Sequence, residues 1–290
     1  MMRSLLQVLF ASVAVGFLGA SRGGLELSRT YAKGEITHYE YVEAVKGRDN
    51  SRSGTEEYKW SMKGVRSLEV KAIDGDAVEL EDIITAQSME GSDPDDKLSE
   101  EEKEPQKYEV KTDRWHSKHV SRELETDDRS MIEQDDLDLE VIEKIQYADL
   151  YPVDEIFTQF PKEAVAPGET WKVKVEASKF RARADQELTG TLVGAEKLDG
   201  VSCNLIRISG TIKVDPDYAE LAKDMGDGGK GWIERNKATG TLKIEIKAYL
   251  RATDGSIQQI KVQHLMQLRP EGSSKARYES DHTYELKRKN

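Results

Sequence analysis

The sequence has only one cysteine, Cys203, among its 290 residues. A single thiol excludes a disulfide within the chain, so packing has to supply the stability that exported proteins often draw from such bridges. Cys203 lies in the strand-like run VSCNLIRI. A buried, inert thiol is a better interpretation of this residue than a nucleophile.

Long hydrophobic runs are absent except at the N-terminus. Arg3 is followed by an uncharged, mostly apolar run over residues 5–17 and by the small-residue sequence Leu18-Gly19-Ala20. This run is too short for a membrane span, and its flanks are those of an export signal. We expect residues 1–20 to be a signal peptide, and the mature protein to be periplasmic or extracellular with no transmembrane anchor. A buried N-terminal helix is the alternative, but no second all-apolar segment exists to pack against it.

Basic residues are outnumbered. The chain carries 55 acidic and 43 basic residues, for a net charge of −12. An acidic protein is repelled by phosphate backbones and anionic membranes, so we expect no nucleic-acid partner. The segment 92–104, which contains SDPDDKLSEEEKE, is almost free of apolar residues, and we expect it to be a mobile acidic loop.

Recognisable catalytic and metal motifs are absent too. No G-x-S-x-G or H-E-x-x-H motif occurs, and GDGGKG at 226–231 lacks the Ser or Thr of a phosphate loop. His116 and His119 fall on opposite faces of a strand without a third ligand. His264 and His282 lie in strand-like runs, where a partly buried histidine with a hydrogen-bond partner is the simpler interpretation. We therefore expect no catalytic residue, no cofactor, no metal site and no enzymatic activity.

Alternation of apolar and polar residues is what the sequence has in abundance. The runs TLKIEIKAYL and IQQIKVQHLMQL each place apolar side chains on one face, and Asp254-Gly255 between them is a strong hairpin turn signal. Asp199-Gly200 and Asp74-Gly75 mark two further hairpins. In VSCNLIRISGTIKV the apolar parity changes midway, which indicates either a β-bulge or burial on both faces.

Two Gly-Glu turns, Gly34-Glu35 and Gly168-Glu169, each precede a strand that has aromatic residues near its start, and a strand-Asp-Gly-strand unit follows each. We interpret the chain as two related halves, with chance similarity of two short turns as the alternative. The expected fold is mainly β, with antiparallel curved sheets in two related halves and one or two short helices. The expected divisions are the signal peptide 1–20, an N-terminal β-rich half over 25–150 that includes the acidic loop 92–104, and a C-terminal β-rich half over 151–290.

Helix signals are few. Asp215, Pro216 and Gly226 supply a start and a stop for a short helix. Pro152 opens a second candidate that would present Phe160 to the core. Trp171 is expected to begin the inward face that continues with Val173 and Val175, and residues 108–138 are expected to form weak strands interrupted by loops.

The signal peptide, YAKGEITHYEY, FPKEAVAPGETW and LDGVSCNLIRISG together resemble a family of exported bacterial β-rich proteins of unknown function. Its members carry a Pro-x-Gly-x-x-Trp signature. The similar stretch here, Pro167-Gly168-Glu169-Thr170-Trp171, departs from it in having no residue between Pro and Gly. The resemblance implies a β-rich exported protein and supplies no catalytic residues.

Our first hypothesis is therefore a non-enzymatic structural or binding protein whose apolar sheet face is left partly as a groove for an apolar or lipid-like ligand or a protein partner. A face closed by packing between the two halves is the competing interpretation. Our second hypothesis is a secreted hydrolase with a site assembled from dispersed histidines and carboxylates. If the groove exists, seven side chains are expected to line it: Leu242, Ile244, Ile246, Leu250, Ile260, Val262 and Met266.

Overall fold

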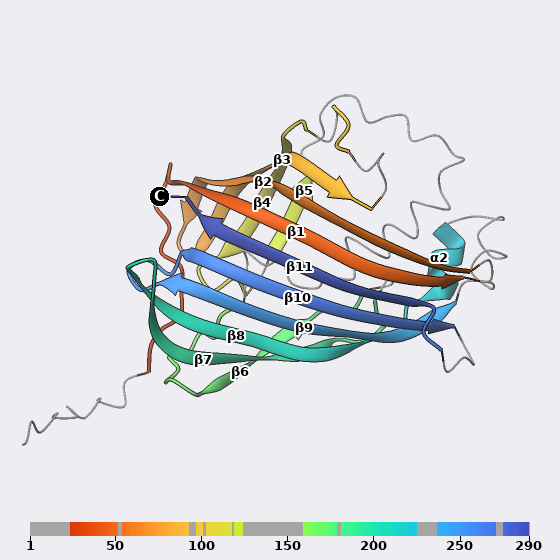
Figure 1. Cartoon of the computed structure of the whole chain (residues 1–290). Coiled ribbons are helices and arrows are strands. Elements are labelled where there is room, and N and C mark those ends of the chain that lie inside the picture. The colour runs from red at the N-terminus through yellow and green to blue at the C-terminus, as the bar shows by residue number, and fades with distance from the viewer. Residues whose placement is uncertain are drawn as a thin grey trace, which may run out of the picture.

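The structure, a computed structural model, describes residues 24–51, 54–92, 97–100, 103–117, 119–123, 159–178, 181–224, 237–270 and 275–289. Within these ranges the protein is one antiparallel sheet with a single short helix (Figure 1). The elements are β1 (Ile36–Ser51), β2 (Gly54–Asp74), β3 (Ala77–Gly91), β4 (Gln106–Asp113), β5 (His119–Glu123), β6 (Thr170–Val175), β7 (Gln186–Leu198), β8 (Val201–Val214), α2 (Tyr218–Asp224), β9 (Ala238–Arg251), β10 (Ile257–Pro270) and β11 (Tyr278–Arg288). The predicted mainly β, antiparallel fold is confirmed.

The strands follow the order β5-β4-β3-β2-β1-β11-β10-β9-β8-β7-β6 in one eleven-stranded sheet. The first and last strands of the chain meet at its centre, from the pair Tyr39–Arg288 to the pair Asp49–Tyr278. The N-terminal strands form one flank and the C-terminal strands form the other. Figure 1 shows the sheet curving strongly, so that β3, β4 and β5 pass behind β1 and β11. We call the face that carries the buried apolar side chains the inner face and the opposite face the outer face.

The two Gly-Glu turns have the same structure, which supports the predicted relation between the halves. In each, the glycine has a positive φ, the following Glu donates its N–H to an Ala carbonyl, and its carboxylate accepts from that Ala N–H. In each, the Gly-Glu pair also exchanges two backbone hydrogen bonds with one residue in the second strand of its half. In that strand a β-bulge comes directly after the bonded residue. The matched residues are Ala32, Gly34, Glu35 and Val70 in one half and Ala166, Gly168, Glu169 and Leu192 in the other.

All three predicted Asp-Gly hairpins form, as β2–β3, β7–β8 and β9–β10. In the β7–β8 turn Asp199 and Gly200 both have positive φ, which is the backbone of a type I′ turn. Both expected explanations of the parity change in β8, a β-bulge and burial on both faces, apply. The bulge lies in β7 between Leu192 and Gly194, while Cys203 is buried on the outer face and Ile206 on the inner face of β8.

The helix predicted from Asp215 begins later than expected. Helix α2 starts at Tyr218, and Asp217 caps it by accepting the N–H of Glu220 at 3.2 Å. Asp215 is not the cap, because its backbone is still paired with Arg181 and Ala182 just after β8; its side chain forms an ion pair with Lys213 at 2.6 Å. The second predicted helix runs from Pro152 to Phe160. Its residues 152–158 lie outside the described residues, as does the predicted boundary between the halves at 150–151, and Gln159 and Phe160 are not helical. Phe160 is buried, as predicted.

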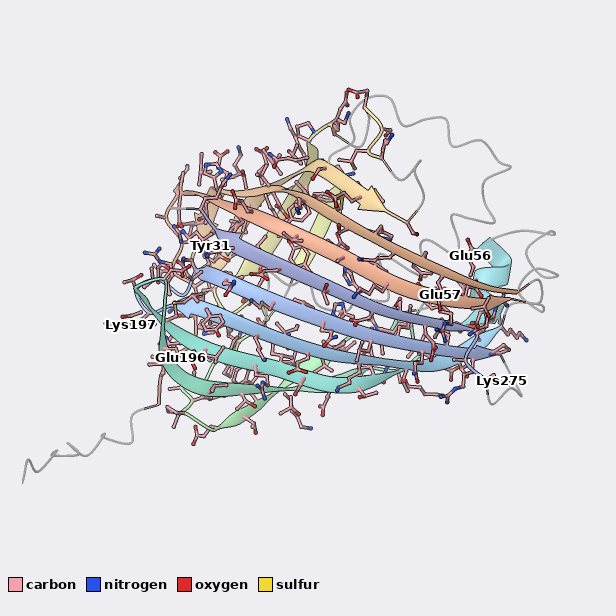
Figure 2. The ribbon with its side chains drawn as sticks, viewed as in Figure 1. Tyr31, Glu56, Glu57, Glu196, Lys197 and Lys275 are labelled. Atoms are coloured by element: carbon pink, nitrogen blue, oxygen red, sulfur yellow. The ribbon has the colours of Figure 1, made fainter. Side chains whose placement is uncertain are left out.

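One end of the curved sheet is closed by a cap, which we define as residues 24–31, 114–117 and 159–165. Three segments that are distant in sequence meet in it. Leu25 and Val165 exchange two backbone hydrogen bonds, Arg29 donates to the carbonyl of Arg114, and Thr30 donates to the carbonyl of Asp254 in the β9–β10 turn. Tyr31 marks this end in Figure 2, and Glu57 and Lys275 mark the opposite end, which we call the far end and near which Figure 1 shows α2.

Candidate functional site

The inner face of β8, β9 and β10 is a continuous apolar surface. Antiparallel partners lie on the same face of a sheet, so Val262 beside Ile246 and Ile246 beside Ile208 form one row across three strands. The structure brings together all seven residues that the sequence predicted for a groove: Leu242, Ile244, Ile246, Leu250, Ile260, Val262 and Met266. Each is at most 4% exposed, so in this conformation the surface is closed by packing rather than open to solvent.

His264 interrupts this apolar surface at the centre of β10. It lies directly opposite His282 of β11, with the two Nδ1 atoms 3.3 Å apart, and Nε2 of His282 lies 2.7 Å from Oε1 of Glu43 in β1. Burial, together with His282, lowers the pKa of His264 to about 3. His264 is therefore neutral at physiological pH, since placing a proton on it would bury a charge beside a second imidazole.

Further along the inner face, β2 and β3 bury an ion pair. Arg66 binds Asp82 through Nε at 3.0 Å and through a terminal nitrogen at 2.6 Å, with side chains only 6% and 3% exposed. Between this pair and the histidines, Tyr41 of β1 stacks on Tyr284 of β11 at 6.0 Å. Burial raises the pKa of Tyr41 to about 12, and the nearby Glu43 carboxylate adds to the shift. The inner face is thus apolar on the C-terminal flank and polar and aromatic at its centre.

Sequence reasoning missed Glu43, Arg66 and Asp82. A signal was present, because each occupies the parity of buried neighbours in its strand, as Glu43 does between Tyr41 and Val45. A charged residue on the inward parity of a strand has to find a partner. Which partner it finds depends on strand order, which the sequence did not show.

The hydrolase hypothesis required histidines to converge with a carboxylate and a serine. His264, His282 and Glu43 do converge, and Ser280 lies on the same face of β11 as His282. Both ring nitrogens of His282 already have contacts, one to His264 and one to Glu43, so neither is left to activate a serine hydroxyl.

His116 lies far from this cluster, in the cap. It contacts the Tyr31 hydroxyl at 2.8 Å and packs against Phe160. His119 begins β5. Across the described ranges no group of three or more His, Cys, Asp or Glu side chains is arranged to hold a metal ion.

The far end of the inner face carries partly exposed apolar and aromatic side chains, which we call the rim: Tyr58, Trp60, Met62, Leu268 and Tyr278. The Tyr58 ring lies directly over Gly47 of β1. The two are so close that a Cβ on this glycine would be 2.0 Å from the ring. Its hydroxyl bonds that of Tyr278, and the two rings stack at 6.2 Å. The rim therefore places partly exposed aromatic, thioether and aliphatic groups at the far end of the inner face.

Trp171 is a packing residue, as predicted, although it is only half-buried. Its ring lies on Gly190 of β7, its Nε1 donates to the carbonyl of Gln159 at 3.1 Å, and Val173 and Val175 continue the same buried face. Cys203 is a free, buried thiol, also as predicted, and burial raises its pKa.

Comparison with known proteins shows only distant likeness. No family model and no curated protein matches the chain. Among solved structures, lipovitellin, studied for its lipid–protein interactions, is 8% identical, with a TM-score of 0.42 over 90% of this chain and 26% of that chain. A DUF1329 family protein from Desulfovibrio piger is 10% identical, with a TM-score of 0.21 over 87% of this chain and 86% of that chain. A candidate outer membrane lipoprotein-sorting protein domain from Vibrio parahaemolyticus is 8% identical, with a TM-score of 0.23 over 87% of this chain and 83% of that chain.

The chain spans about a quarter of the lipovitellin chain, 26% by coverage. These likenesses are too low for a functional argument, so function is argued from the geometry of the inner face. In the part of the chain that the structure describes, no helix is both long and apolar enough to cross a membrane.

Proposed function

We propose that the protein is an exported, non-enzymatic binding protein that holds an apolar or lipid-like ligand against the inner face of β8, β9 and β10. The observation that carries this proposal is the continuous apolar surface that ends at the partly exposed rim. An apolar surface with a few polar groups at its border is the usual composition of a small-molecule site.

Because the seven surface residues are at most 4% exposed, the ligand binds only when the packing over them opens. The rim is the natural entrance, since the opposite end is tied shut by the backbone hydrogen bonds of the cap. Methionine and aromatic side chains adapt to apolar ligands of different shapes, which suits an entrance.

Two features support binding rather than catalysis. The His282 nitrogens are both engaged, and the low pKa of His264 makes it a weak base at neutral pH. The cluster serves a structural purpose instead, because it satisfies polar groups at the border of the apolar surface.

The test is the binding of a fluorescent fatty-acid analogue to purified protein, together with lipid extraction after gentle purification. Leu268→Glu places a charge on the partly exposed rim and should weaken binding about tenfold or more, which corresponds to ~1.4 kcal/mol. Val42→Glu is the matched control, because Val42 is an apolar outer-face residue that is 42% exposed. If the fluorescent analogue fails to bind wild-type protein and extraction yields no lipid, the proposal fails. Equal weakening by both variants would also oppose it.

A further inference from the structure

The outer face of the sheet is hollowed near the far end. The depression has a volume of about 980 Å³ and lies over β1, β2 and β8 to β11. Its charged side chains alternate along the strands with buried inner-face residues such as Ile244 and His264, so it opens on the opposite face of the sheet. We call it the outer groove, and its polar and charged lining consists of Lys46, Arg48, Glu57, Tyr58, Lys59, Ser92, Thr211, Thr241, Lys243, Gln267, Glu279, Ser280 and Asp281.

Each acidic side chain of the outer groove has a neighbour that satisfies it. Glu57 forms an ion pair with Arg48 at 2.7 Å. Glu279 accepts a hydrogen bond from Gln267 at 3.1 Å, and Asp281 accepts one from Gln263 at 3.0 Å. The carboxylates are therefore held in place within the groove.

Three lysines of the groove, Lys46, Lys59 and Lys243, form no ion pair with any residue that the structure describes. Several lysines elsewhere on the protein do contact carboxylates, as Lys172 does with Glu187 at 2.7 Å. Lys46 also lies directly opposite Lys59 in the β1–β2 pair. Like charges at directly opposed positions destabilise a sheet, and an anion bound between them would offset that repulsion.

The lysines occupy one transverse row of the sheet. Successive partners run from Lys59 to Lys46, then through Asp281 and Leu265 to Lys243. Lys46 and Lys243 are three strand spacings apart, which is about 14 Å. A ligand that contacts both ends of this row therefore has to be elongated.

The negative net charge of the whole protein does not prevent an anion from binding here. At physiological ionic strength, exposed charges farther away than about 8 Å are largely screened. The local potential is therefore set by the side chains of the groove itself, in which Lys46, Arg48, Lys59 and Lys243 outnumber Glu57, Glu279 and Asp281. The concave shape also selects the type of ligand. A narrow soluble chain enters a depression, whereas the broad plane of a bilayer surface rests on its margins.

We propose that the outer groove binds an elongated, soluble polyanion with phosphate-like groups, one end between Lys46 and Lys59 and the other at Lys243. The amines of these lysines donate to the anionic oxygens as point charges. This site is independent of ligand binding on the inner face.

The probe is linear inorganic polyphosphate of increasing chain length, measured by calorimetry at low and physiological salt. Affinity should rise with chain length until the chain spans the row, and it should fall with added salt. The triple variant Lys46→Gln, Lys59→Gln, Lys243→Gln should lose about tenfold or more in affinity, equivalent to ~1.4 kcal/mol. The control triple Lys33→Gln, Lys107→Gln, Lys197→Gln removes the same charge from exposed lysines outside the groove and should bind as wild type does.

Equal losses in the two triple variants would show a nonspecific charge effect and overturn the proposal. So would the absence of binding to wild-type protein. Vesicles of anionic phospholipid provide a further arm. If they bind in a manner sensitive to the groove lysines while polyphosphate does not bind, the site is a membrane contact and the soluble-ligand proposal is wrong.

Discussion

Acid should destabilise the protein through His264, and the structure sets the size of the effect. The pKa of this imidazole is about 3 in the folded protein, because it is buried beside His282. In the unfolded chain it returns to about 6.5. The unfolded state therefore binds more protons between these two values, so the free energy of unfolding falls as the pH drops below about 6.5.

Each pH unit inside this window costs ~1.4 kcal/mol. Between pH 7 and pH 5, His264 should remove about 2 kcal/mol from the free energy of unfolding. The nearby carboxylate does not relieve this cost, because Glu43 contacts the far side of His282 rather than His264.

Urea unfolding of wild-type protein and His264→Asn at pH 7, 6 and 5, followed by tryptophan fluorescence, measures the effect. An asparagine amide can replace Nδ1 of His264 as the partner of His282 without taking up a proton. The pH 7 to pH 5 loss should be about 2 kcal/mol smaller in the variant, by the same linkage. His38→Asn is the control, because His38 is exposed and contacts only the Ser67 hydroxyl among the described side chains. Identical pH dependence in wild-type protein and His264→Asn would refute the reasoning.

Three further expectations concern packing. Replacing Asp82 by Ala leaves Arg66 buried without its carboxylate and should cost about 3–5 kcal/mol in urea unfolding, whereas the exposed Glu57→Ala on the outer face should cost less than about 1 kcal/mol. A Cβ at position 190 would meet the Trp171 ring at 2.2 Å, so Gly190→Ala should displace the indole, shift its emission and destabilise the protein by about 1–3 kcal/mol; unchanged emission would contradict this packing. The raised pKa and burial of Cys203 should make its reaction with a thiol reagent follow unfolding, and rapid labelling of native protein would show the thiol to be accessible.

Features that depend on neighbouring residues could be read directly from the sequence. The three Asp-Gly hairpins, the inward parity of β9 and β10, and the inward face from Trp171 to Val175 all follow from turn chemistry and from the two-residue period of a strand. The seven-residue apolar surface was predicted for the same reason. The strand face that these residues occupy follows from the local sequence, whereas the burial of that face depends on the rest of the fold.

The start of α2 marks the limit of local signals. Asp215 and Asp217 both qualify as caps by residue type. Asp217 is the cap because the backbone of Asp215 is still paired with Arg181 and Ala182 just after β8. Competition between nearby partners is decided by backbone geometry that a residue pattern does not contain.

Only the tertiary structure decided which strands meet at the centre of the sheet. Pairing β1 with β11 brings Glu43 to His282, 239 residues apart in sequence, and the same arrangement places Lys46 beside Asp281. No periodicity predicts such contacts, because many strand orders bury the same apolar faces, and the entropy of loop closure grows only slowly with loop length. The sequence therefore determined the faces of the strands, whereas the order of the strands determined the polar cluster of the inner face and the lysine row of the outer groove.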